Sequence, residues 1–209
     1  MQNNNLRKKA MLALLLCVAM PCLQAQVAHI GDILCEGNAI VRPTNYSSSN
    51  ATAIGVVFYV DNTGQHGWAI ALQDAGSFEW GMSGSDTPLV NVANVGRRRA
   101  IYDLDGYENT RVVREYSTDM PAFYAFDFES GWYLPAIGQL NYLYANMLEV
   151  NASLAVVGGE SFETTNYWEY WSSTEYSAIA ACHLDSHGDV FHQNDYKNCS
   201  RRVRAAHNF

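Results

Sequence analysis

Apolar runs first alternate with turn-forming residues in the N-terminal third of the chain. Residues 54–60, Ile-Gly-Val-Val-Phe-Tyr-Val, form a β-branched and aromatic run that is typical of a buried strand. Residues 61–64, Asp-Asn-Thr-Gly, are turn chemistry, because Asn and Gly tolerate positive φ. Residues 68–72 are apolar again. The pattern predicts a β-hairpin, preceded by an entry strand at residues 30–34 and followed by an irregular stretch at residues 76–100.

Two later segments have the spacing of helices. Asp105 and Glu108 match a capping box, in which the first side chain accepts from the backbone and the second reaches back. This helix is predicted to continue through Tyr116 and to stop at Pro121. A second helix is predicted from Leu134-Pro135, since proline at the first helical position loses no hydrogen bond. Its interior Gly138 costs about 1 kcal/mol. Its core positions recur at helical spacing, at Ile137, Leu140, Tyr144 and Met147.

After Gly158-Gly159 the pattern changes to short strands. They are predicted at residues 167–173, 178–185, 190–193 and 202–206, with a turn at residues 186–189. Strands that flank two helices in mixed order predict the α+β class, with a mixed or antiparallel set of short strands. The chain has neither an internal repeat nor a low-complexity linker, so we expect one domain over residues 29–209.

The N-terminus has the layout of an export signal. Arg7, Lys8 and Lys9 precede an apolar run at residues 10–20, and Leu-Gln-Ala ends at Ala25. This predicts a signal peptide over residues 1–25. The apolar run is shorter than the roughly 20 residues of a membrane span, and Pro21 precedes Cys22 where a lipidation motif needs Gly or Ala. We therefore expect an exported protein, in the periplasm, on the outer-membrane surface or outside the cell, without membrane insertion after cleavage.

Removal of the signal peptide makes the chain strongly acidic. It leaves 10 Lys and Arg against 21 Asp and Glu, a formal charge of −11. Such a charge argues against nucleic acid and anionic membranes as partners. With 48% hydrophobic and 12% aromatic residues, the composition is that of a globular domain rather than a disordered one.

Three cysteines follow the predicted cleavage site: Cys35, Cys182 and Cys199. Export permits a disulfide, and the favoured pair is Cys182–Cys199, because both residues fall in the predicted C-terminal sheet. Closing that loop would stabilise the fold by about 3 kcal/mol, with Cys35 left as a buried thiol. Three reduced, buried cysteines are the alternative.

Three motifs occur in a fixed order: Gly-Trp-Tyr-Leu-Pro at residues 131–135, Trp-Ser-Ser-Thr-Glu at residues 171–175, and Arg-Val-Arg-Ala at residues 202–205. Together with residues 31–35 and 55–61, they resemble the C-terminal domain of bacterial collagen-like adhesins in its Bacteroidetes form. The resemblance implies a C-type-lectin-like fold, related to that of sulfatase-modifying proteins. We expect Trp132 and Trp171 to be core side chains, because tryptophans supply large buried areas.

The predicted ligand-contact surface lies in the C-terminal part of the chain. Aromatic faces stack on sugar rings, while amide and carboxylate groups bind hydroxyls. The residues chosen on this basis are Trp168, Glu169, Tyr170, Asn194 and Asp195. Residues 194–199 also partly resemble the calcium- and sugar-binding stretch of C-type lectins. Gln193 stands where those lectins have tryptophan, so a polar loop is favoured over a calcium site.

One cluster of side chains has metal-ligating chemistry: His183, Asp185, His187, Asp189 and His192. Alternation along a strand places residues 183, 185 and 187 on one face, but nothing in the sequence fixes the tetrahedron that zinc needs. An exposed polar hairpin is favoured, and we expect no metal and no other cofactor.

The leading hypothesis for function is a non-enzymatic, exported surface domain, an adhesin or a fimbria-associated component that binds a glycan or a surface protein. Two alternatives stay open. One is a metal- or cysteine-dependent enzyme related to the sulfatase-modifying fold, whose closely spaced cysteine pair this chain lacks. The other is a structural module that only packs against a partner chain.

Overall fold

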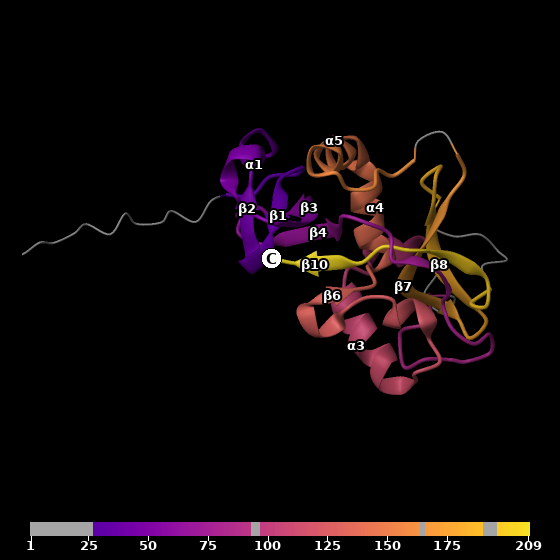
Figure 1. Ribbon diagram of the computed structural model, residues 1–209. Coiled ribbons are helices and arrows are strands. Elements are labelled where there is room, and N and C mark those ends of the chain that lie inside the picture. The colour runs from indigo at the N-terminus through magenta and orange to yellow at the C-terminus, as the bar shows by residue number, and fades with distance from the viewer. Residues whose placement is uncertain (1–26, 93–96, 164–165, 190–195) are drawn as a thin grey trace, which may run out of the picture.

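Two sheets and four α-helices make up the described part of the chain in the computed structural model (Figure 1). The structure describes residues 27–92, 97–163, 166–189 and 196–209. The predicted α+β class is confirmed, with two more helices than the sequence analysis expected. The helices are α1 (Pro43–Ser49), α3 (Gly106–Tyr116), α4 (Ile137–Ala145) and α5 (Met147–Val157).

The first sheet has six strands in the order β2-β1-β3-β4-β10-β6, and every neighbouring pair is antiparallel. Its strands are β1 (Ile33–Cys35), β2 (Ala39–Val41), β3 (Ala53–Val60), β4 (Gly67–Ala71), β6 (Trp132–Tyr133) and β10 (Ala206–Asn208). The predicted hairpin is the β3–β4 pair, in which Val56 lies opposite Ile70. The Asp61 side chain holds the turn by accepting from the Thr63 amide at 3.0 Å.

The second sheet has four strands in the order β5-β9-β7-β8. These are β5 (Gly76–Glu79), β7 (Glu169–Ser177), β8 (Ala180–Asp185) and β9 (Ser200–Val203). The β7–β9 pair is parallel, whereas β5–β9 and β7–β8 are antiparallel. Strand β5 falls inside the stretch predicted to be irregular, and the predicted strand at residues 190–193 lies outside the described residues.

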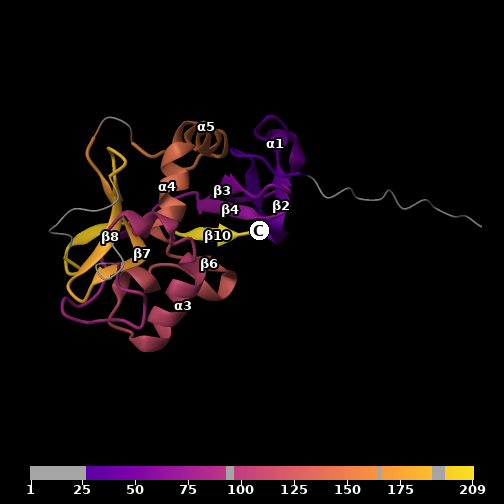
Figure 2. The ribbon, with the colours of Figure 1, turned by 180° about the vertical axis from the view of Figure 1, so that it is seen from behind.

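The chain passes from one sheet to the other at Arg204 and Ala205. The single strand predicted at residues 202–206 is therefore wrong, since β9 ends at Val203 and β10 begins at Ala206. The buried Arg204 guanidinium bridges this crossing by donating to the carbonyl oxygens of Ala71 at 3.0 Å and Leu72 at 2.7 Å. In the reverse view the C-terminus lies at the same end of the molecule as α1 and β2 (Figure 2).

Four 3₁₀ helices complete the secondary structure of the described residues: η1 (Glu36–Asn38), η2 (Arg97–Tyr102), η3 (Pro121–Tyr124) and η4 (Phe128–Ser130). The Asp105 cap of α3 is confirmed, because its side chain accepts from the Glu108 amide at 3.3 Å. Glu108 instead pairs with Arg111 one turn later. The predicted second helix begins later than expected, at Ile137, and Asn146 separates α4 from α5.

Two hydrophobic clusters cover opposite faces of the four-stranded sheet. Tyr170, Cys182 and Leu184 point into the cluster shared with the six-stranded sheet, α4 and α5. Trp171, Ala181 and Val203 point into the cluster that contains Val113 of α3 and Phe123 of η3. Adjacent residues on one strand thus belong to different clusters, as the alternation of side chains along a strand requires. Trp171 is fully buried as expected, whereas Trp132 is half-buried against His207.

The predicted Cys182–Cys199 disulfide is not formed, and both residues are thiols. Cys182 lies on β8 and Cys199 directly precedes β9, while β7 runs between those two strands. Two strand spacings amount to about 9–10 Å, well beyond the roughly 4.4–6.8 Å between Cα atoms that a disulfide spans. The two side chains also pack into different clusters. Membership of one sheet was therefore not enough to pair them.

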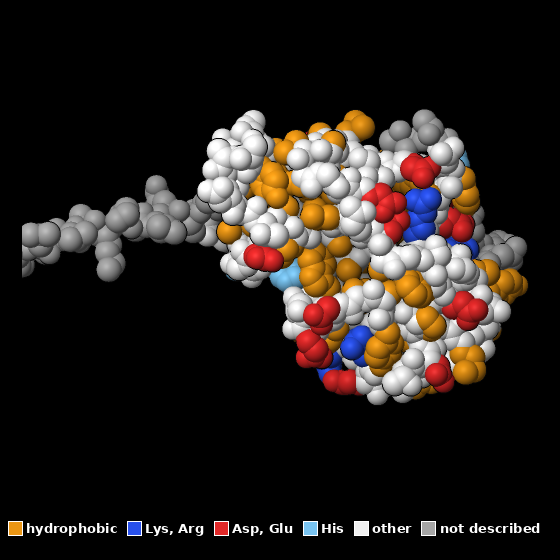
Figure 3. All heavy atoms as spheres, in the orientation of Figure 1, with side chains coloured by type: hydrophobic (Ala, Val, Ile, Leu, Met, Phe, Trp, Pro, Cys, Tyr) orange, Lys and Arg blue, Asp and Glu red, His pale blue; other side chains and the backbone are white. Residues whose placement is uncertain are grey.

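The predicted signal peptide, residues 1–25, lies outside the described residues. Within the described ranges, no helix combines the length and apolar character that a membrane crossing requires. On the face shown in Figure 3, Lys and Arg side chains stand next to Asp and Glu side chains rather than gathering into a basic patch.

Candidate ligand-binding site

Strand alternation separates the three predicted contact residues at the start of β7. Trp168 and Tyr170 point into the core, with only 3% and 2% of their surfaces exposed. The Trp168 indole donates to the Glu163 carbonyl oxygen at 2.5 Å, and the Tyr170 hydroxyl donates to the Asp74 carboxylate at 2.8 Å. The expectation that these two rings form an exposed stacking surface is thus corrected, because successive side chains of an extended chain face opposite ways.

Glu169 lies on the other face of β7, within a small polar cluster. Its carboxylate accepts from the Tyr167 hydroxyl at 2.8 Å and lies 3.1 Å from Nε of Arg201. Nε2 of the buried His183 is 3.4 Å from the same carboxylate. Burial, together with the bond to Glu169, raises the pKa of Tyr167 to about 12. Glu169 is therefore held by its neighbours.

The other predicted contact residues, Asn194 and Asp195, lie outside the described residues, as does His192 of the proposed metal cluster. Asp185 accepts from the backbone amides of His187 at 2.8 Å and Asp189 at 2.9 Å, which is the chemistry of a turn. In the part of the chain that the structure describes, no three His, Cys, Asp or Glu side chains gather as a metal site would require.

The Trp-Ser-Ser-Thr-Glu motif of β7 joins distant segments from inside the protein. The Ser173 amide donates to the Pro135 carbonyl oxygen at 2.8 Å, and the Ile137 amide donates to the Thr174 hydroxyl at 2.9 Å. These two bonds fix the start of α4 against β7. The motif therefore acts as a framework that positions other elements.

Glu175, the last residue of this motif, forms a fully buried ion pair with Lys197. Its carboxylate also accepts from the amide of Thr87 at 3.1 Å and from the hydroxyl of Thr87 at 3.0 Å. Burial raises the pKa of Glu175 and lowers that of Lys197, because water no longer solvates either charge, and the pairing opposes both shifts. The pair anchors the loop that contains Thr87 onto β7.

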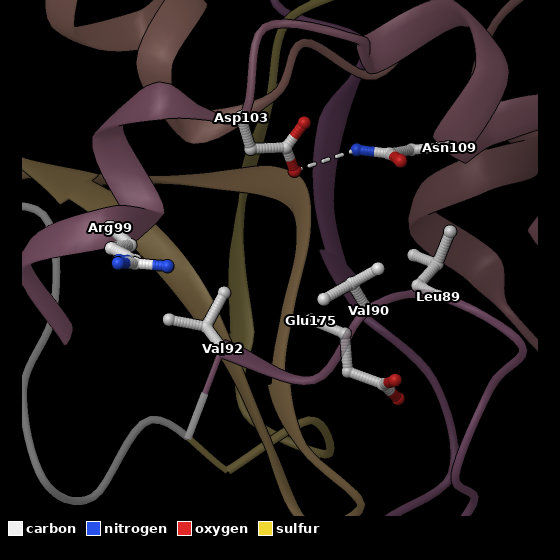
Figure 4. Close-up of a pocket in the computed structure, with 7 residues that line it drawn as sticks. All are labelled: Leu89, Val90, Val92, Arg99, Asp103, Asn109 and Glu175. Carbon is white, nitrogen blue, oxygen red and sulfur yellow. Dashed lines mark hydrogen bonds between the residues drawn. The ribbon is translucent and has the colours of Figure 1, made fainter. Parts of the chain in front are cut away.

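A pocket of about 240 Å³ opens beside this anchored loop. Four separate segments supply its lining: the loop, η2 and the turn after it, the first half of α3, and β7 (Figure 4). The lining residues are Leu89, Val90, Val92, Arg99, Asp103, Asn109 and Glu175. At about 30 Å³ for each water molecule in the liquid, the volume suits one sugar unit or one amino-acid side chain.

The polar wall of the pocket is held by internal hydrogen bonds. Oδ2 of Asp103 accepts from Asn109 at 2.9 Å and from Thr174 at 2.8 Å, and Oδ1 accepts from the Asp105 amide at 3.2 Å. The Asn109 amide nitrogen also donates to the Ser173 hydroxyl at 3.2 Å. Asn109 is thereby oriented, with its amide nitrogen engaged. Figure 4 shows the Arg99 guanidinium on the opposite side of the pocket from Asn109.

The local sequence patterns do not predict this pocket. Asp105 is recognisable as a helix cap, but nothing local links Asp103 to Thr174, which lies 71 residues further on. One signal was present, namely three consecutive arginines at residues 97–99 in a chain with few basic residues. Combining apolar and polar groups in a hollow of this kind is typical of a binding site for a small ligand.

Comparisons with known proteins include a solved structure that shares the fold. It is a fimbrial protein from Bacteroides ovatus ATCC 8483, with a TM-score of 0.66 and 18% sequence identity. The match covers 87% of this chain and 49% of the fimbrial protein, so the chain spans about half of that protein's length. At this identity the likeness shows a common fold. No protein-family model and no curated protein match the sequence.

Proposed function

We propose that this chain is an exported surface module, an adhesin or a fimbria-associated component that binds a glycan or a surface protein. The observation that supports the proposal is the fold shared with a fimbrial protein over 87% of the chain. The N-terminal layout of charged, apolar and small residues supports export. The pocket beside the Thr87 loop is the surface that we assign to the ligand.

We also propose that the module is C-type-lectin-like and related to the collagen-like adhesin domain. The motifs that carry the resemblance lie together in this fold. Pro135 and Ile137, at the end of the first motif and just beyond it, bond to Ser173 and Thr174 of the second. Tyr170 of β7 lies opposite Arg202 of the third motif in the parallel β7–β9 pair. Because these motifs bond to one another and hold the same elements together, we expect proteins that share this fold to retain them.

A binding role, rather than a catalytic one, suits the chemistry of the pocket. The Asp103 carboxylate accepts bonds at both oxygens, and Glu175 is neutralised by Lys197 and bonded to Thr87. An acid or base catalyst must exchange a proton with its substrate. Carboxylates engaged in this way instead keep the pocket wall in a fixed shape, which favours recognition.

The test is a glycan array probed with the mature protein, residues 26–209, in calcium and again in chelator. The wild-type protein is compared with Val90→Asp, at the pocket, and with Leu148→Asp, on α5. The two positions are matched, since 74% of Val90 and 75% of Leu148 is exposed. Both variants should fold, so that a difference between them reports on the pocket.

We expect binding that survives chelation, that Leu148→Asp retains and that Val90→Asp weakens. Binding lost in chelator would move the site to Asn194 and Asp195, whose oxygens suit calcium. If no glycan binds in either calcium or chelator, a glycan is excluded as the ligand. Capture of a surface protein would then have to show the same difference between the two variants. Equal behaviour of the two variants would exclude the pocket.

A further inference from the structure

The pocket contains three ionisable side chains, and only Arg99 is without a bonded partner in the described part of the chain. Asp103 accepts from Asn109, Thr174 and the Asp105 backbone, while Glu175 is paired with Lys197. The Arg99 guanidinium is exposed at the pocket edge and extends toward its interior (Figure 4). The donors to Asp103 are neutral and leave its charge in place, so the pocket wall carries one negative charge at Asp103 and one positive charge at Arg99. Because the Asp103 oxygens are already bonded, Arg99 is the charged group that remains free to bind a ligand.

Arg99 has no bonded partner among the described residues, and in this it differs from the other arginines whose side chains are described. Each of those has a carboxylate partner or a backbone oxygen within reach. The contacts are Arg42 with Asp32, Arg111 with Glu108 and Glu115, Arg114 with the Phe123 carbonyl oxygen, Arg201 with Glu169, Arg202 with Glu163, and Arg204 with the Ala71 carbonyl oxygen. Structural roles account for that set, which leaves Arg99 available to a ligand.

The groups around Arg99 suit a carboxylated sugar. A guanidinium binds a carboxylate through two parallel hydrogen bonds, and the Asn109 amide, oriented by Asp103, can accept from a hydroxyl. Tyr102 follows Arg99 by three residues in η2, so both side chains project from the same side of this 3₁₀ helix. Tyr102 does not line the pocket, but it is 76% exposed, and its aromatic face can stack on a sugar ring that extends out of the pocket along η2.

We propose that this pocket binds a single carboxylated sugar residue, of the uronic or sialic acid type, with its carboxylate on Arg99. The inference rests on the proposed function and adds the ligand class to it. The volume of about 240 Å³ limits the site to one such unit. A terminal residue of a glycan fits better than a polyanion, because the formal charge of −11 repels an extended acidic chain.

The experiment is an NMR titration of the mature protein with sodium D-glucuronate, N-acetylneuraminate and D-glucose. Acetylated dialanine is the fourth probe and supplies a peptide carboxylate. The variants are Arg99→Gln and Arg99→Lys, with Arg111→Gln on α3 as the matched loss of a surface arginine outside the pocket. A charge-assisted hydrogen bond predicts that Arg99→Gln weakens binding of the sugar acid by about 10- to 100-fold.

The proposal expects one of the two sugar acids to bind more tightly than glucose and than the peptide. It also expects Arg99→Gln to lose this binding, Arg99→Lys to keep part of it, and Arg111→Gln to behave as wild type. Equal binding of glucose, equal binding of the peptide, no binding of either sugar acid, or an unaffected Arg99→Gln each overturns it. If Arg99→Gln still binds an array glycan as wild type does, this inference fails while the proposed function stands.

Discussion

Lys197 is the single lysine after residue 25, and its side chain is fully buried. It pairs with Glu175, donates to the Ser85 carbonyl oxygen at 2.6 Å, and lies over the Trp80 ring, 4.6 Å from the centroid. A buried ion pair is costly to desolvate, and removal of one partner leaves the other charge without compensation. This ion pair fixes the loop that forms the apolar wall of the pocket.

Lys197→Met should lower the free energy of unfolding by about 3–5 kcal/mol, because it leaves the Glu175 carboxylate buried and unpaired. Adding Glu175→Gln should restore much of that loss, since the remaining amide carries no charge. Chemical denaturation of the single and double variants measures both effects. As a control, Arg111→Met breaks an exposed ion pair and should have a much smaller effect. Additive losses in the double variant would contradict the pairing.

The loss caused by Lys197→Met should also depend on pH. Burial raises the pKa of Glu175, and without Lys197 nothing charged opposes this shift. Below the ordinary carboxyl pKa of about 4.3, Glu175 is protonated in both the folded and the unfolded state, and the penalty is smallest. As the pH rises further, the unfolded chain loses its proton first, so stability of the variant falls relative to wild type. Denaturation midpoints from pH 4 to 7, about the range in which carboxyl groups titrate, test this, and a constant difference would refute it.

At the scale of elements, Gly138 connects α4 to the turn that holds Asp103. Its amide donates to the Asp103 carbonyl oxygen at 3.0 Å. A Cβ atom at this position would lie 2.4 Å from the Ile101 carbonyl oxygen and 2.5 Å from that of Asp103. By propensity alone, glycine weakens a helix by about 1 kcal/mol. The tertiary contact explains why it stands here, because α4 and the end of η2 approach too closely for any side chain.

Gly138→Ala should therefore destabilise the protein by about 1–3 kcal/mol, the usual cost of overpacking, although alanine is the better helix former. It should also weaken ligand binding, since η2 carries Arg99. Asn141→Ala, at an exposed position of the same helix, should have the opposite sign and raise stability by a few tenths of a kcal/mol. Thermal unfolding of the two variants shows whether helix propensity or the close contact with η2 dominates at Gly138. A Gly138→Ala variant more stable than wild type would show that the backbone of η2 can move to accommodate a methyl group.

At the scale of the whole molecule, the four-stranded sheet is buried on both faces. The cluster on one face joins it to the six-stranded sheet, α4 and α5, and the cluster on the other joins it to α3 and η3. Lys197 packs against Trp80 of the second of these clusters, and its side chain is fully buried. Its amine is therefore exposed to solvent only when the surrounding structure opens. Openings of such buried parts cost free energies approaching that of global unfolding.

An amine-directed reagent should thus modify the folded mature protein at its N-terminus and leave Lys197 unmodified. In denaturant, Lys197 should react as well, and its modification should follow the unfolding transition. Mass spectrometry of peptides after labelling across a denaturant series provides the measurement. Modification of Lys197 well below the transition would mean that this edge of the sheet opens on its own.

Patterns in the sequence were enough to predict the features that depend on neighbours along the chain. The β3–β4 hairpin follows from two apolar runs around Asp61 and its turn, and the Asp105 cap follows from its position before α3. The α+β class follows from the order of such segments. These features are local, because a turn or a cap closes hydrogen bonds within a few residues.

How those segments meet depends on tertiary contacts, which the sequence patterns did not reveal. In the folded protein, Trp168 and Tyr170 face the core while Glu169 faces the other side of β7. Strand β7 lies between the two cysteines, and the one predicted C-terminal strand is two strands that meet at Arg204. Tertiary contacts also bring a loop, η2, α3 and β7 together around Arg99. Contacts across such distances in sequence leave no periodic pattern, since each depends on where the partner segment lies. The candidate site is made of contacts of this kind, and for that reason the fold class was predictable while the pocket was not.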